Sequence, residues 1–310
     1  MILGVDTSNY TTSAALLDTS GKLIAQKRER LEVKQGERGL RQSEAVFQHV
    51  KKLPDVIAEI AEDRKGELTK IVVSTSPTSQ PNSYMPVFRV GEGQAKSLAS
   101  ILGLPLVETT HQEGHLMAGV WSTGLETEEF LAIHLSGGTS ELLKVSKKQE
   151  LGFEVEVLGT SQDLHAGQFI DRVGVELGLP FPAGPCLEEL ATEGELGEII
   201  IPSAVDGYQM SFSGPTSAAM RAIEAGEKKA DIALAVQQAI ANTVEKVVRK
   251  AVVEEKLTEI LIVGGVAANQ YIRARLRKRL EHPRIGAKLY FADPEWSSDN
   301  AVGTAALALE

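Results

Sequence analysis

The sequence predicts an α/β protein built from two similar halves. The chain has 310 residues, which is enough for about two domains. Hydrophobic residues make up 43% of it and charged residues 24%, a composition typical of globular proteins and unlike that of disordered or coiled-coil chains. The same order of predicted strands and helices also occurs twice, on either side of an acidic stretch at 124–129. We therefore expect an N-terminal half at 1–124 and a C-terminal half at 125–310.

The first half begins with three strand-like runs that are separated by turn residues such as Ser20 and Gly21. Such closely spaced runs predict an antiparallel meander, and the segments that follow alternate between helix and strand. Residues 75–86 contain three prolines and are predicted to form a long loop. The predicted elements are strands at 2–8, 12–17 and 23–31, a helix at 42–61, a strand at 70–75, a helix at 91–102, a strand at 105–108 and a helix from residue 110.

The second half repeats this order and carries an additional helical insertion at 180–226. Its predicted elements are strands at 130–135, 141–145 and 153–158, helices after residue 166, a helix at 231–255, a strand at 260–263, a helix at 269–280, a strand at 288–292 and a closing helix at 298–309. Duplicated α/β halves of this kind match the architecture shared by actin, heat-shock ATPases and sugar kinases. In that architecture two domains face each other across a nucleotide-binding cleft, into which the carboxyl ends of the strands open.

The charge balance restricts the choice of binding partner. With 32 basic and 42 acidic side chains the net charge is −10, so the surface as a whole repels phosphate backbones and anionic membranes. A nucleic acid would have to dock on a local basic patch, and the segment from Arg273 to Arg279 is the densest one. No aromatic side chains alternate with its basic residues, so a solvated helix face is the alternative interpretation.

The sequence also predicts the compartment. The single cysteine, Cys186, permits no internal disulfide, and the first residues have neither the basic flank nor the apolar length of a signal peptide. No apolar run approaches the roughly 20 residues that a membrane-spanning helix needs. We therefore expect a cytoplasmic protein without a membrane segment; its oligomeric state stays open, with a homodimer as one alternative.

Two polar turns lie at matching points of the two halves. The turn after the first strand contains Asp6 and Ser8, whose neighbours can offer backbone N–H groups to phosphate, while the Asp6 carboxylate can hold a metal or a water. The matching turn of the second half has two glycines, which allow a phosphate to approach the backbone, and its residues are Ser136, Gly137, Gly138 and Thr139. Short hydroxyl residues and glycines also favour ordinary turns and hairpins, which is the alternative for both.

A second group of candidates for nucleotide binding lies further along the chain. Gly264 and Gly265 follow the strand at 260–263, and small residues there let a flat ring or a phosphate lie against the main chain, with Asn269 capping the next helix. Close packing of the helix would explain these glycines equally well. Asp171 is a candidate for a contact with a ribose.

The spacing of two histidines predicts a metal site. His111 and His115 are four residues apart at the start of a predicted helix, which places both imidazoles on one face. By the internal repeat, Asp299 follows the equivalent strand of the second half, so these three residues form a candidate site of two histidines and one carboxylate. His134 is a further candidate near the metal, although a strand histidine is more often packed or hydrogen-bonded. An accidental histidine pair is the alternative.

Together, these segments resemble the TsaD family, the tRNA threonylcarbamoyladenosine transferases formerly known as glycoproteases. The resemblance spans nearly the whole chain, and three motifs in this order are jointly very specific: the histidine pair, Ser211-Phe212-Ser213-Gly214 and the Gly264–Asn269 turn. The other matching segments are Ile2–Ser13, Ala95–Ala99, Ser136–Gly138, Ala183–Glu188 and Asp299–Asn300. The resemblance implies one divalent metal, with iron or zinc expected, and a threonylcarbamoyl-adenylate or another adenine nucleotide as ligand. It also implies a role for Gly184 in binding, a tRNA adenosine as acceptor, and partner proteins of the TsaB type.

The chain departs from the family pattern at several polar positions. The family has ionisable side chains where this chain has Thr139, Leu164, Gln168 and Thr216. A divergent paralog with weak tRNA modification or a changed acceptor is therefore expected, because fewer polar groups would stabilise charge in the transition state. The alternative from another class is a non-catalytic scaffold that binds nucleotide or a partner protein. Phosphoryl transfer lacks a clear catalytic base near the first turn, and peptidase activity lacks a nucleophile paired with a base.

Overall fold

The computed structural model describes residues 1–8, 10–33, 40–62, 64–149 and 151–309, and the chain divides into two compact units. The first unit comprises Met1–Leu125, Lys147–Glu154 and Glu295–Glu310, and the second comprises Glu126–Ser146 and Val155–Pro294. The predicted halves were continuous, whereas the first unit takes up two later segments of the chain. The C-terminal segment belongs to it because that segment packs against the first strand, as described below.

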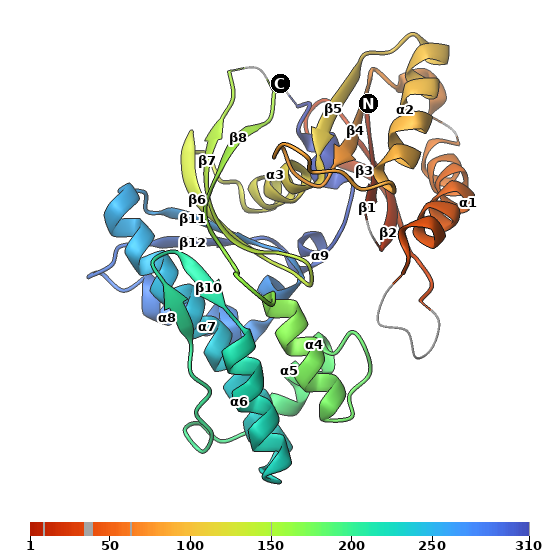
Figure 1. Cartoon of the computed structure of the whole chain (residues 1–310). Coiled ribbons are helices and arrows are strands. Elements are labelled where there is room, and N and C mark those ends of the chain that lie inside the picture. The colour runs from red at the N-terminus through yellow and green to blue at the C-terminus, as the bar shows by residue number, and fades with distance from the viewer. Residues whose placement is uncertain (9, 34–39, 63, 150, 310) are drawn as a thin grey trace. The chain divides into compact units, whose positions relative to one another are not determined.

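The first unit is built on a five-stranded sheet with the order β3-β2-β1-β4-β5 (Figure 1). The predicted meander is present, since β1 pairs antiparallel with β2 and β2 with β3. The remaining pairs, β1 with β4 and β4 with β5, are parallel, so these three strands end at the same edge of the sheet. The strands are β1 (Ile2–Ser8), β2 (Thr11–Leu17), β3 (Leu23–Arg30), β4 (Lys70–Ser76) and β5 (Leu106–Thr110).

Helices cover both faces of this sheet, and the alternation of side chains along the strands decides which face each residue joins. Leu3 and Val5 belong to the core formed with α1 (Gln42–Ala61) and α2 (Phe88–Leu102), whereas Ile2 packs with α3 (His111–Thr123). The helix α10 (Val302–Ala306) lies on the α3 face as well. Gly4 permits this contact, because a Cβ atom at position 4 would lie 2.5 Å from the carbonyl oxygen of Ala301. A short 3₁₀ turn, η1 (Lys65–Glu67), precedes β4.

The predicted closing helix at 298–309 is interrupted, which corrects the sequence-based expectation. The structure has two short helices instead, α9 (Pro294–Ser297) and α10. The Asn300 side chain causes the break: its amide donates to the carbonyl oxygens of Trp296 and Ser298, and its carbonyl oxygen accepts from the backbone N–H of Val302. These bonds end one helix and cap the next, and they leave Asp299 in the irregular link between them.

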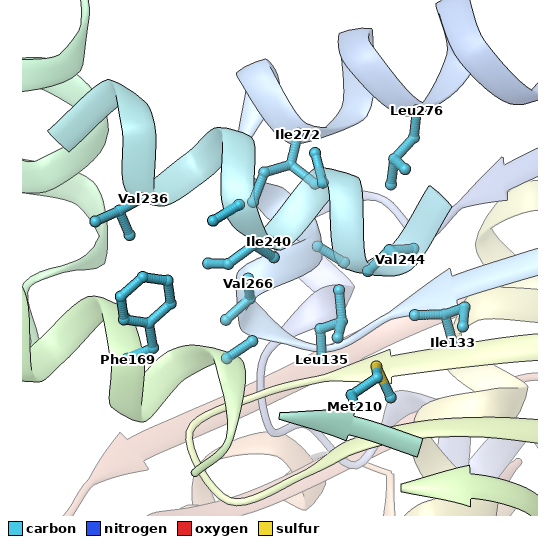
Figure 2. Packing of buried hydrophobic residues seen from close by; sticks show 14 of the residues in the cluster. Ile133, Leu135, Phe169, Met210, Val236, Ile240, Val244, Val266, Ile272 and Leu276 are labelled. Carbon is cyan, nitrogen blue, oxygen red and sulfur yellow. The ribbon is translucent and has the colours of Figure 1, made fainter. Parts of the chain in front are cut away.

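The second unit contains the other five-stranded sheet, with the order β12-β11-β6-β7-β8. Its hydrophobic core lies between this sheet and the helices α4, α7 and α8, and Figure 2 shows residues such as Ile133, Phe169 and Ile240 packed together there. About two thirds of the residues of helix α7 are buried, which agrees with its apolar composition. The elements of this unit are β6 (Glu129–Leu135), β7 (Ser140–Lys147), β8 (Phe153–Thr160), α4 (Ala166–Glu176), α7 (Lys229–Glu255), β11 (Glu259–Val263), η2 (Gly265–Ala268), α8 (Gln270–Leu280) and β12 (Lys288–Phe291).

The predicted insertion at 180–226 contains two helices, α5 (Gly184–Ala191) and α6 (Ser213–Glu224), together with a small hairpin. The hairpin pairs β9 (Ala204–Asp206) with β10 (Gln209–Ser211), and the sequence did not predict it. Its strands have three residues each, too few for a period of two to be recognised. No helix in the described part of the chain combines the length and the apolar composition that a membrane crossing requires.

Candidate metal centre and nucleotide-binding loops

The two histidines of the predicted metal site lie on the first turns of α3. This helix starts directly after β5, because Thr110 caps it: the Thr110 hydroxyl accepts from the backbone N–H of Glu113, and the Glu113 carboxylate accepts from the backbone N–H of Thr110. The rings of His111 and His115 meet edge to face, with their centroids 4.5 Å apart. Their Nε2 atoms are 3.1 Å apart, so both point toward one place.

Asp299 completes the group, as the internal repeat predicted. Its Oδ1 atom lies 3.5 Å from Nε2 of His111 and 3.4 Å from Nε2 of His115. Close packing of α10 on α3 brings them together, since a Cβ atom at Gly303 would lie 1.9 Å from the carbonyl oxygen of Gly114. Among the described residues these three form a group whose ligand atoms all lie within 4.8 Å of one another.

The donor set fits a divalent transition metal. Two imidazole nitrogens and one carboxylate oxygen suit zinc or iron, and ligand bonds of about 2.1 Å place neighbouring donors about 3.0 to 3.4 Å apart in octahedral or tetrahedral geometry. The separations of 3.1, 3.4 and 3.5 Å in this cluster are close to that range. Three protein ligands would also leave coordination positions open for a substrate.

Opposite charges in the cluster shift its ionisation equilibria. Burial alone would lower the pKa of His111, but Asp6 and Asp299 outweigh burial and raise it to about 10. Burial would raise the pKa of Asp299, yet its hydrogen bonds to the two histidines hold that pKa well below its usual range. The pKa of Asp6 is likewise lowered, because the charge of His111 and its hydrogen bond outweigh burial. The carboxylates therefore stay ionised, which is the form that ligates a cation, whereas His111 is protonated at neutral pH, so a metal ion would have to displace the proton from its Nε2.

Two residues predicted to contact nucleotide, Asp6 and Ser8, lie beside this cluster in the first unit. Asp6 is fully buried at the end of β1, and its Oδ2 atom is 2.8 Å from Nδ1 of His111. Ser8 donates its backbone N–H to Oδ1 of Asp6 at 2.9 Å. Sequence analysis missed the Asp6–His111 contact, although parallel pairing of β1, β4 and β5 could have indicated it, because such strands end at one edge. It also missed Thr11, whose hydroxyl donates to Oδ2 of Asp299 at 3.4 Å.

Two further acidic residues of the first unit, Glu113 and Glu295, have structural partners. Glu113 is buried and accepts hydrogen bonds from Thr109, Thr110, Lys148 and the backbone N–H of Phe153, which ties the segment Lys147–Glu154 to α3. Glu295 is exposed and accepts from Gln26. Neither carboxylate belongs to the metal-ligand group.

The glycine turn of the second unit is a tight hairpin with an open side. Ser136 donates its backbone N–H to the carbonyl oxygen of Thr139 at 2.8 Å and accepts at its own carbonyl from the N–H of Gly167. A Cβ atom at Gly137 or Gly138 would meet nothing within 4 Å, so the space beside these glycines is open. A hairpin alone does not need both residues to be glycine there, because neither has a positive φ.

The two glycines after β11 have different environments. Gly264 has a φ of 96°, and a Cβ atom there would lie 2.3 Å from the carbonyl oxygen of Leu135, so this glycine is required by packing. Gly265 faces open space and is exposed. Asn269 caps α8 as predicted, since its side-chain oxygen accepts from the backbone N–H of Ile272 at 2.9 Å. Gly265 is thus the residue of this pair with room for a ligand.

Three further candidates also lie in the second unit. Asp171 accepts from the backbone N–H of Ala183 at 2.8 Å, and burial raises its pKa. Gly184 begins α5, and a Cβ atom there would meet nothing within 4 Å. His134 is buried on β6, and its ring lies against Gly264. The roles predicted for them in binding stay predictions.

The basic helix α8 uses part of its charge within the second unit. Arg273 donates to the carbonyl oxygens of Ala267 and Ala292, and the guanidinium groups of Arg273 and Arg277 lie over the ring of Phe291. Arg279 faces α7 and borders a groove of about 700 Å³. The other residues that line this groove are Ile200, Ile201, Pro202, Ser203, Asn242, Glu245, Lys246 and Arg249.

Comparison with known proteins identifies the family to which this chain belongs. The model of the TsaD family, described as tRNA N6-adenosine threonylcarbamoyltransferase, matches residues 23–306. The chain is 30% identical to the tRNA N6-adenosine threonylcarbamoyltransferase of Archaeoglobus fulgidus, over 96% of this chain and 87% of that protein. It is 28% identical to the probable bifunctional tRNA threonylcarbamoyladenosine biosynthesis protein of Methanothermobacter thermautotrophicus, and covers 54% of its length.

Solved structures show the fold. HypF of T. kodakarensis has a TM-score of 0.65 at 15% identity, over 99% of this chain and 47% of that one. A ROK family glucokinase from Streptomyces griseus has a TM-score of 0.55 at 13% identity, over 98% of this chain and 97% of that one. The predicted actin-like and sugar-kinase architecture is therefore confirmed. Because the family model spans most of the sequence and a 30% identical relative aligns over nearly its whole length, the chain belongs to the TsaD family of acyltransferases.

Proposed function

We propose that this chain transfers a threonylcarbamoyl group to an adenosine of tRNA. The observation that carries the proposal is the convergence of His111, His115 and Asp299 on one point within a chain of the TsaD family. These residues would hold one divalent ion, with iron or zinc expected from the donor set. When bound, such an ion would act as a Lewis acid toward a carbonyl of the donor.

The chain's own groups have separate tasks in this proposal. The ligating side chains would fix the position of the ion, and their carboxylate would offset its charge. The turn at Ser136–Thr139 and the exposed Gly265 would bind an adenine nucleotide or the threonylcarbamoyl-adenylate, because backbone N–H groups next to open space can approach phosphate and a flat ring. Asp171, Gly184 and Asn269 would support that site.

The tRNA would dock on basic residues of the second unit. Lys246, Arg249 and Arg279 line the groove between α7 and α8, and all three are exposed. The one acidic residue of the groove, Glu245, is buried and paired with both arginines. The groove therefore carries net positive charge in a chain whose net charge is −10, which favours a phosphate backbone. Partner proteins of the TsaB type and a cytoplasmic location belong to the same proposal.

Reduced activity or a changed acceptor is part of the proposal. At several positions where the family has ionisable side chains, this chain has residues that contribute to the fold instead. Gln168 accepts from the backbone N–H of His165 and so caps α4, while Thr216 donates its hydroxyl to the carbonyl oxygen of Phe212. Leu164 packs against the core. Ionisable groups that the family has at these positions would be missing from the reaction. A non-catalytic scaffold is the second candidate, favoured by the same observation.

The experiment that tests the proposal supplies the purified chain with metal, donor adenylate, tRNA and TsaB-type partners, and then measures threonylcarbamoyladenosine in digested tRNA by mass spectrometry. Product formed by the natural chain and abolished by His111→Ala supports transfer. Absence of product, with nucleotide still bound, would favour the scaffold.

A further inference from the structure

A buried carboxylate beside the candidate metal centre, Asp6, lies outside the group of three metal ligands. Asp6 is 0% exposed, so its carboxylate is kept away from water. Burying a charge is costly unless hydrogen bonds and an opposite charge compensate for it. Its two oxygens have different partners: Oδ1 accepts from the backbone N–H of Ser8 at 2.9 Å, and Oδ2 lies 2.8 Å from Nδ1 of His111.

The two nitrogens of the His111 ring therefore face opposite surroundings. Nδ1 points to the Asp6 carboxylate, and Nε2 points to Nε2 of His115 and Oδ1 of Asp299. An ionised carboxylate can only accept a hydrogen bond, so Nδ1 must carry the proton. The ring nitrogen left for a metal is then Nε2, which is the one that faces the other two ligands.

We propose that Asp6 is a positioning residue for the metal centre: it fixes the His111 ring with Nδ1–H donating to its carboxylate and Nε2 available as ligand. This inference rests on the proposed metal site and adds a residue that acts through His111. A carboxylate behind a ligating imidazole fixes the ring and raises its basicity, and its removal typically costs about 10- to 100-fold in metal affinity. Asp299 has a partner of its own, because the Thr11 hydroxyl donates to its Oδ2 atom while Oδ1 faces the histidines.

The surroundings of Asp6 predict the effect of an isosteric change. In Asp6→Asn, the backbone N–H of Ser8 would keep the amide oxygen at the Oδ1 position. The amide NH₂ group would then occupy the Oδ2 position and face Nδ1 of His111. Two donors cannot pair, so the neutral ring would carry its proton on Nε2 and lose its ligand atom. Asp6→Ala removes the orienting group altogether.

Glu113→Gln is a matched control on α3, the helix that carries both histidines. It also exchanges a buried carboxylate for an amide, with the same change of charge, two residues from each histidine. Its carboxylate bonds to threonines, Lys148 and the backbone N–H of Phe153 rather than to a histidine ring. The control should lower the melting temperature and leave metal affinity within about twofold, because the orientation of His111 does not depend on it.

The test measures Zn²⁺ and Co²⁺ affinity of the full chain by competition with a chelator, together with the visible spectrum of the Co²⁺ form. We expect the affinity of Asp6→Asn and Asp6→Ala to fall about 10- to 100-fold, with an altered Co²⁺ spectrum. In the Zn²⁺ form of the natural chain, NMR should show the His111 Nδ1–H as a downfield resonance protected from exchange. This last readout needs no variant.

Several results would overturn the inference. Asp6 variants that bind metal as tightly as the natural chain would show that the carboxylate does not position the ligand, while leaving the metal site itself intact. If Asp6→Asn and Glu113→Gln decreased metal affinity equally, the loss of a negative charge would explain the decrease, and a positioning role for Asp6 would be excluded. If the natural chain bound no metal, and His111→Ala behaved identically, both this inference and the proposed metal site would be wrong.

Discussion

At the scale of single residues, one carboxylate outside the metal cluster anchors the Ser-Phe-Ser-Gly motif. Asp163 accepts from the backbone N–H groups of Leu164, Phe212 and Ser213, and from the hydroxyls of Ser211 and Ser213. Although burial raises its pKa, these hydrogen bonds outweigh burial and hold the pKa of Asp163 well below its usual range. The motif that identifies the family therefore also has a structural role.

The depressed pKa predicts how stability depends on pH. A carboxylate whose pKa is lowered by folding stabilises the protein above its unfolded pKa, about 3.9, and that contribution disappears as pH falls through the folded value. We expect Asp163→Asn to reduce the free energy of unfolding at pH 7 by about 1 kcal/mol, because Asp163 is exposed and solvent weakens hydrogen bonds to a charged group. Denaturant unfolding at pH 7 and pH 3 measures the difference. A difference between natural chain and variant that grew toward low pH would contradict the assignment.

At the scale of elements, the turn after β11 contains two adjacent glycines with different roles: Gly264 is required by packing, and Gly265 is a candidate for nucleotide binding. We expect Gly264→Ala to reduce the free energy of unfolding by more than about 1 kcal/mol, because of the positive φ and the contact with Leu135. Gly265→Leu should leave the melting temperature unchanged and weaken ATP or AMP binding at least about tenfold, about 1.4 kcal/mol, by filling the open space.

The control for this comparison is Gly93→Leu, an exposed helical glycine in the first unit whose Cβ position is also open. Calorimetric titration of ATP and AMP distinguishes the variants. Unchanged nucleotide affinity in a folded Gly265→Leu protein would place the nucleotide elsewhere.

Most elements could be predicted from the sequence because their patterns are long. The strand at 2–8 and the helix at 42–61 agree with the structure in both bounds, since a buried run and an amphipathic period each extend over several residues. The interruption of the C-terminal helix at Asn300 could not be predicted, because it depends on the backbone groups with which the Asn300 side chain forms hydrogen bonds. The histidine spacing indicated two metal ligands, whereas Asp6 behind His111 depends on pairing between strands far apart in sequence.

At the scale of the whole molecule, a strongly acidic chain must bind its proposed acceptor through a small basic surface. Replacing Lys246, Arg249 and Arg279 with glutamine should weaken tRNA binding, and the logarithmic slope of affinity against salt should fall by about 1 for each phosphate that these side chains no longer neutralise. A triple variant of the exposed residues Lys22, Arg30 and Lys51 removes the same charge from the first unit and is the control. Titration of labelled tRNA at several salt concentrations gives both quantities. Equal effects of the two variants would show that net charge, not the groove, governs binding.

The central claim is that transfer to tRNA depends on one metal held by His111, His115 and Asp299. The most direct measurement removes metal from the natural chain with a chelator, restores Zn²⁺ or Fe²⁺ in steps, and follows threonylcarbamoyladenosine formation beside the bound metal. We expect the rate to rise in proportion to occupancy and to level off at one ion per chain, with His111→Ala combined with His115→Ala inactive at every step. Product formed at full rate by the metal-free chain, or by the double variant, would contradict the claim.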